Sequence, residues 1–114
     1  MKNKPIVNYE QSWNASDYND YATAQYEIAL KALKSLTFKG DESVLDIGCG
    51  DGAISYFIAK NYTPNGKVLG IDLSTDMINL AKKSYKNENL KYKNVSAIDI
   101  ALSNKIDLVT SFYC

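Results

Sequence analysis

The chain has 114 residues, 46% of them hydrophobic, which suits one compact domain better than two domains or a disordered segment. Its 13 basic side chains, all lysines, are balanced by 13 acidic ones, so no excess of positive charge is available to bind a nucleic-acid backbone. Histidine is absent, which removes the commonest general base and metal ligand, and we expect no metal site.

The two cysteines indicate a reducing compartment. Cys49 and Cys114 lie far apart and have neither the spacing of a disulfide framework nor that of a metal site. No apolar run approaches the roughly 20 residues needed to cross a bilayer, and the polar first residues resemble no targeting peptide. We therefore expect a cytoplasmic protein without a membrane partner.

The amino-terminal part of the chain changes character at Tyr21. Residues 1–20 mix aromatic, amide and acidic side chains without periodicity, which predicts an irregular, lid-like segment. From Tyr21 the apolar positions step by four and three residues, which predicts a helix over residues 21–40 that packs on a sheet. The apolar stripe of this helix comprises Ala22, Tyr26, Ala29, Leu33 and Leu36.

Two strand–helix units follow. Residues 43–47 form an aliphatic run bounded by glycines, which predicts a buried strand, and the helix after it is closed by the turn residues 64–66. Residues 67–71 predict a second strand, and Ser74 is the expected N-cap of the helix that follows. The core face of that helix is predicted to comprise Met77, Leu80, Ala81 and Ser84.

The remaining chain predicts two more strands, at residues 90–95 and 106–112, with a short helix or turn at 99–103 between them. Strands that alternate with helices indicate parallel βαβ units with right-handed crossovers. We therefore predict an α/β fold in which residues 43–114 form a Rossmann-like parallel sheet with the strand order 3-2-1-4.

The turn after the first strand carries three alternate glycines, Gly48, Gly50 and Gly52. Glycine allows positive φ and close approach of a ligand to the main chain, and the N–H groups at a helix N-terminus favour an anionic group. Asp72 ends the second strand, where a carboxylate can accept both hydroxyl protons of a ribose. Together these features predict a nucleotide-like ligand.

Two ligand classes share this geometry. The spacing from Gly48 to Ala53 also satisfies a loose dinucleotide fingerprint, so an NAD-type domain is one alternative. Asp46, two residues before the first glycine, favours the other class. Its carboxylate would repel a pyrophosphate and attract the ammonium and sulfonium groups of S-adenosylmethionine.

Two motifs in this region resemble a known family. Residues 44–52, VLDIGCGDG, resemble motif I of the class I S-adenosylmethionine-dependent methyltransferases, and residues 68–74, VLGIDLS, resemble the segment that follows it. The stretches 13–18 and 106–114 are similar to small-molecule methyltransferases of the juvenile-hormone-acid and trans-aconitate type. The resemblance implies S-adenosylmethionine as cofactor, S-adenosylhomocysteine as product and a small-molecule acceptor.

The resemblance also implies individual cofactor contacts, although no catalytic side chain. Asp46, Gly48 and Gly50 would face the methionine moiety, and Cys49 would contribute backbone contacts. Asp72 would hold the ribose hydroxyls. The adenine contacts would come from Leu73, Met77, Ile98 and Asp99, the far wall from Ser111, and a cover over the methionine end from Tyr18 and Gln25.

Methyltransferases of this class continue through three more strands that form much of the substrate pocket, whereas this chain ends at Cys114. We therefore expect a single, incomplete domain over residues 1–114 that is weakly active or inactive alone, with a non-catalytic module that holds the cofactor or its product as an alternative. The fourth strand would be an apolar sheet edge without lysine or proline in residues 108–112, which predicts self-association through that edge.

Overall fold

The computed structural model describes the main chain of residues 15–98 and 105–112, with side chains from residue 23 onward. Four parallel strands form one sheet in the order β3-β2-β1-β4, which confirms the predicted fold class and strand order. The strands are β1 Ser43–Ile47, β2 Lys67–Ile71, β3 Leu90–Lys93 and β4 Leu108–Thr110.

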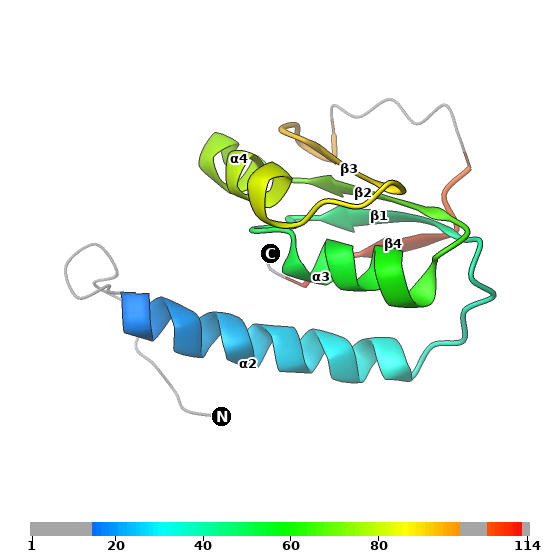
Figure 1. The fold of residues 1–114 in the computed structure, drawn as a ribbon, viewed down its shortest axis with the longest axis horizontal. Helices are drawn as coiled ribbons and strands as arrows, with labels where there is room; N and C mark the ends of the chain where they lie inside the picture. Colours follow the sequence, from blue (N-terminus) through cyan, green and yellow to red (C-terminus); the bar gives the residue numbers. More distant parts are fainter. Residues whose placement is uncertain (1–14, 99–104, 113–114) are drawn as a thin grey trace.

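Two short helical segments pack directly on the sheet, and the long amino-terminal helix packs on them (Figure 1). The short helix α3, Ala53–Phe57, continues into a π-helical turn, η1, Ile58–Tyr62, and this pair lies between the sheet and the long helix α2, Ala15–Lys34. Helix α4, Thr75–Ser84, lies against β3. Among the described residues, no helix combines the length and the apolar character that a bilayer span requires.

The bounds of α2 differ from the prediction at both ends. The helix begins at Ala15, so residues 15–20 are helical and not irregular. The prediction overlooked helix formers such as Ala15, because this segment has no apolar periodicity. The helix ends at Lys34, and the Leu36 N–H bonds the Leu33 carbonyl at 3.1 Å in a tightened last turn. Leu36 therefore leaves the stripe and is exposed.

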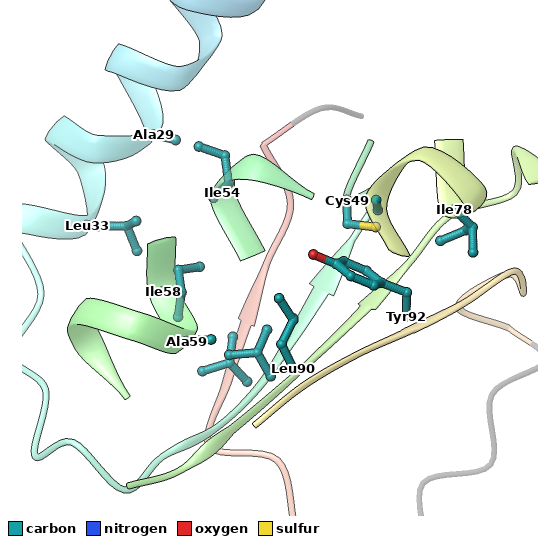
Figure 2. Packing of buried hydrophobic residues seen from close by; sticks show 12 residues of the cluster. Ala29, Leu33, Cys49, Ile54, Ile58, Ala59, Ile78, Leu90 and Tyr92 are labelled. Atoms are coloured by element: carbon teal, nitrogen blue, oxygen red, sulfur yellow. The ribbon is translucent and has the colours of Figure 1, made fainter. Parts of the chain in front are cut away.

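One hydrophobic core lies between the sheet and these helices (Figure 2). Its members from α2, Ala29 and Leu33, were predicted from the periodicity, and both are fully buried. On α4 the buried residues are Ile78 and Ala81, whereas Leu80 is exposed, so the predicted face of this helix was wrong in part. The sheet contributes Val44, Val68, Leu90 and Tyr92, and α3 with η1 contributes Ile54, Ile58 and Ala59.

The last two strands are shorter than predicted, β3 at its carboxyl end and β4 at both ends. β3 ends at Lys93 and β4 spans three residues, because pairing in the sheet is limited by the partner strands β2 and β1. The helix or turn expected at 99–103 lies outside the described residues.

Candidate functional site at the carboxyl edge of the sheet

The loop between β1 and α3 is a tight turn that requires its glycines. Gly48, Gly50 and Gly52 have φ values of 69°, 57° and 90°, in the left-handed region that strains other residues. The N–H groups of Gly48 and Cys49 both donate to the Ile71 carbonyl, at 2.8 and 2.9 Å. The loop is therefore fixed to the end of β2, at the edge where the parallel strands terminate.

Asp72 lies directly beside this loop. Its Oδ2 accepts from the Gly50 N–H at 2.9 Å, and its Oδ1 accepts from the Ser74 N–H at 2.9 Å. The side chain is only partly buried, and a carboxylate has further lone pairs that can accept hydroxyl protons. The carboxylate is thus held between the glycine loop and the start of α4 with capacity left for a ligand.

Asn94, which sequence reasoning missed, supports the main chain of Asp72. Its Nδ2 donates to the Asp72 carbonyl at 3.0 Å, and its Oδ1 accepts from the Thr75 hydroxyl at 3.0 Å. The Asp72 N–H in turn donates to the Lys93 carbonyl at 3.2 Å. A polar amide residue directly after β3, at the same sheet edge, was the signal that could have identified it.

Asp46 is buried beneath the loop, with only 1% of the residue exposed. Its Oδ2 accepts from the Ser55 hydroxyl at 2.6 Å and its Oδ1 from the Thr110 hydroxyl at 2.8 Å. Burial raises the pKa of Asp46, the two hydroxyl groups oppose this, and the negative charge of Asp72 adds to the rise. The carboxylate therefore lies at the predicted edge but is enclosed, and a contact with a ligand remains a prediction.

Cys49 is a fully buried residue of the same loop. Burial raises the pKa of its thiol to about 12, and the carboxylates of Asp46 and Asp72 contribute to the rise. The thiol is therefore neutral at physiological pH and cannot act as a nucleophile. Its side chain instead fills the space left free by Gly70, where a Cβ atom would lie 3.0 Å from the Cys49 sulfur.

Comparison with known proteins identifies the family that shares this arrangement. A family described as "Methyltransferase domain" matches residues 44–114, more than half of the chain. A protein of Invertebrate iridescent virus 6, provisionally named methyltransferase 235L, is 34% identical over 90% of this chain and 37% of its own length. The chain belongs to the S-adenosylmethionine-dependent methyltransferases. This membership sets aside the dinucleotide alternative.

Two further methyltransferases extend the comparison. The juvenile hormone acid O-methyltransferase of Drosophila melanogaster is 34% identical over 66% of this chain and 27% of its own length. A crystal structure from Listeria monocytogenes, provisionally described as an S-adenosylmethionine dependent methyltransferase, is 31% identical with a TM-score of 0.63. It is matched over 79% of this chain and 40% of its own. The chain thus spans less than half the length of each of these relatives.

The other residues predicted for the cofactor site of this methyltransferase domain are only partly placed. Leu73 and Ile98 follow β2 and β3 and are 75% and 93% exposed. Met77 and Gln25 are partly buried, and Ser111 is exposed after β4. Tyr18 belongs to the first turns of α2, which lie at the same end of the molecule as the glycine loop (Figure 1). The Tyr18 side chain and Asp99 lie outside the described residues.

A hollow of about 530 Å³ lies elsewhere on the methyltransferase domain. It is lined by residues 36–39 and 41–43 at the amino end of β1 and by Lys105, Asp107 and Leu108 at the amino end of β4. This is the edge opposite to the glycine loop. Ligands of open parallel sheets bind outside the carboxyl ends of the strands, so the hollow does not define the cofactor site.

Proposed function

We propose that this chain binds S-adenosylmethionine at the carboxyl edge of its sheet and forms the cofactor-binding part of an enzyme that methylates a small molecule. The observation that carries the proposal is Asp72, whose carboxylate is held at 2.9 Å from both the Gly50 and Ser74 nitrogens beside a loop of positive-φ glycines. This geometry combines a ribose acceptor with a main-chain surface that a ligand can approach closely.

The remaining contacts are proposed from the positions of the side chains. Exposed Leu73 and Ile98, with partly buried Met77, offer apolar surface for an adenine ring beside Asp72. The negative charges of Asp46 and Asp72 favour the cationic end of the ligand. The complete proposed set for cofactor binding is Asp46, Gly48, Cys49, Gly50, Asp72, Leu73, Met77, Ile98, Asp99, Ser111 and Tyr18.

The contribution of this chain to methyl transfer is binding and orientation. When bound, S-adenosylmethionine supplies an electrophilic methyl group, and S-adenosylhomocysteine remains after transfer. An acceptor that is already nucleophilic needs mainly to be positioned in line with the methyl group. Among the described residues of this edge, Asp46 is enclosed and the Cys49 thiol is neutral, so neither can deprotonate an acceptor.

We also propose that the chain alone, which spans less than half the length of the relatives it matches, transfers methyl groups weakly or not at all. A small-molecule acceptor is preferred to nucleic acid, because residues 110–113 read Thr-Ser-Phe-Tyr and lack the Asn/Asp-Pro-Pro-aromatic signature associated with methylation of amino groups of bases. The balanced charge of the chain gives no separate attraction to a phosphate backbone. The cytoplasm is the proposed location, on the basis of the two cysteines and their spacing.

Replacing Asp72 by asparagine is the test of the binding site. Hydrogen bonds to a charged group contribute about 1.5–3 kcal/mol, so the affinity for S-adenosylmethionine and S-adenosylhomocysteine is expected to fall about 10- to 100-fold. Isothermal titration calorimetry measures this, with NAD as a ligand that should not bind. Asp76→Asn, an exposed acid in the first turn of α4, is the matched control and should bind normally. Equal affinity in both variants, or no binding by the unaltered chain, would contradict the proposal.

Self-association through β4 is a second proposal, and a specific asymmetry of the sheet supports it. The β3 edge carries exposed Lys91 and Lys93, which discourage strand pairing, whereas Val109 on the β4 edge is 55% exposed. We expect sedimentation velocity at tens of micromolar to show dimers of the chain and Val109→Lys to shift them to monomers. Leu80→Lys, on the exposed face of α4, should leave the dimers intact. Monomers of the unaltered chain would rule out this mode of association.

A further inference from the structure

The enclosed carboxylate of Asp46 depends on two hydroxyl groups that reach it from different elements. Ser55 lies in α3 and Thr110 in β4, and each hydroxyl donates to a different carboxylate oxygen, at 2.6 and 2.8 Å. Ser55 is fully buried and Thr110 nearly so. Each carboxylate oxygen is therefore matched by one donor that water cannot easily replace.

The register of the sheet shows how this arrangement is built. Asp46 of β1 is paired with Gly70 of β2 on one side and with Thr110 of β4 on the other. A Cβ atom on Gly70 would lie 3.0 Å from the Ser55 hydroxyl oxygen, so the absent side chain leaves the room that this hydroxyl occupies. On one side of Asp46, Thr110 supplies a hydroxyl group. On the other side, Gly70 leaves space for the hydroxyl group of Ser55.

No cation compensates this buried charge within the described ranges. The titratable groups that face Asp46 are Asp72 from the end of β2, Cys49 from the glycine loop and Tyr92 from β3, and none of them carries positive charge. A buried anion without a counter-ion is retained at a cost in stability. Asp46 is the penultimate residue of β1 and so lies near the same sheet edge as the proposed cofactor site.

We propose that Ser55 and Thr110 are positioning residues for the amino-acid end of the ligand: their hydroxyl groups hold the Asp46 carboxylate beneath the glycine loop, where it attracts the ligand's ammonium group. This inference rests on the proposed function. The competing explanation is that the hydrogen bonds of the two hydroxyl groups only stabilise the packing of α3 and β4 on β1. The two explanations differ in which part of a ligand should lose affinity when a hydroxyl is removed.

Two ligands that differ only at the amino-acid end separate these explanations. S-adenosylhomocysteine carries the ammonium group, and 5′-methylthioadenosine has the same adenosine and thioether without it. The variants Ser55→Ala and Thr110→Val each remove one donor, and Thr110→Ser keeps it. With the 114-residue chain, we expect each donor-removing variant to bind S-adenosylhomocysteine about 10-fold more weakly. The same variants should bind 5′-methylthioadenosine as the unaltered chain does. Thr110→Ser should bind both ligands as the unaltered chain does.

The pH dependence gives an independent readout. Without a hydroxyl donor the neutral form of Asp46 is favoured, so the loss of S-adenosylhomocysteine affinity should grow as the pH is lowered from 8 to 5. Burial raises the pKa of Cys49 to about 12 and raises that of Tyr92 above its ordinary value, so both stay protonated in this range. Asp72 serves the ribose that both ligands share, and the ratio of the two affinities cancels its effect.

The outcomes are distinct. Parallel weakening of both ligands, or weakening that does not change between pH 8 and pH 5, would show that the hydroxyls only hold α3 and β4 to β1 and would overturn the inference. Thermal unfolding of each variant checks that it folds, and Thr110→Ser, the mildest change, supplies the comparison if Thr110→Val does not fold. Absence of binding of both ligands to the unaltered chain would instead refute the proposed function, and this inference with it.

Discussion

Replacing Gly52 by alanine is expected to destabilise the fold by about 3 kcal/mol or more. Gly52 has φ 90°, a conformation that strains any residue with a Cβ atom. The new Cβ would also lie 2.5 Å from the Tyr92 hydroxyl oxygen and 2.9 Å from the Ala81 Cβ. Tyr92 cannot easily withdraw, because it is buried and its hydroxyl donates to the Tyr85 carbonyl at 2.8 Å.

Urea unfolding measures this effect, and a second glycine separates its two causes. Gly40 has φ 104°, but a Cβ there would meet only the Pro64 Cδ, at 3.9 Å. Gly40→Ala should therefore show the backbone strain alone, about 1 kcal/mol. In a Tyr92→Phe background the hydroxyl oxygen closest to the new Cβ is absent, and part of the loss caused by Gly52→Ala should be recovered. Equal destabilisation by the two glycine variants would show that the crowding against Tyr92 and Ala81 is unimportant.

The strands that sequence reasoning placed best are those flanked by turn-forming residues. β1 and β2 have the predicted residues, 43–47 and 67–71, because turn residues on both sides mark where a buried run must stop. β3 and β4 lie at the sheet edges, and there the partner strand decides how far pairing extends. The start of α2 was missed for a related reason, since a polar segment carries no apolar period.

The residues of the candidate site likewise fall into those that the sequence predicted and those that it did not. The glycine loop and Asp72 were predicted because they belong to one contiguous strand–turn–helix pattern and its successor. Asn94, Ser55 and Thr110 were not, because their importance depends on which strands become neighbours and in what register. Thr110 meets Asp46 only once β4 is paired with β1, 64 residues further along the chain. Local patterns identify the residues of the loop and of the strand end more readily than the residues that hold them.

Asp46→Asn is expected to give a more stable protein at neutral pH that binds the cofactor product about 10-fold more weakly or worse. Burial raises the pKa of Asp46 in the native state. The contribution of this carboxyl group to stability is therefore complete below its unfolded pKa of about 3.9 and is lost as the pH rises through the higher native value. Asparagine is neutral throughout and avoids this loss, and the Ser55 and Thr110 hydroxyls can donate to or accept from its amide.

The melting temperature of the variant relative to the unaltered chain should accordingly rise between pH 4 and pH 8, by about 4 °C for each kcal/mol recovered. Asp107→Asn is a control of opposite sign. The Ser43 N–H, which donates to Asp107 Oδ2 at 2.9 Å, lowers the pKa of the Asp107 carboxyl group. The stabilising effect of this carboxylate is therefore present above its unfolded pKa. Asp107→Asn should accordingly lower the melting temperature, relative to the unaltered chain, as the pH rises. A relative loss of stability in Asp46→Asn at high pH would contradict the argument.

If Asp46→Asn is more stable and also binds S-adenosylhomocysteine more weakly, stability and binding oppose each other at Asp46. A buried charge that weakens the fold at the pH at which it is ionised has no structural advantage over a neutral amide of the same shape. Its value must then lie in an interaction that only the charge can make. The ammonium group of S-adenosylhomocysteine supplies such an interaction, and 5′-methylthioadenosine, which lacks it, should bind Asp46→Asn and the unaltered chain equally.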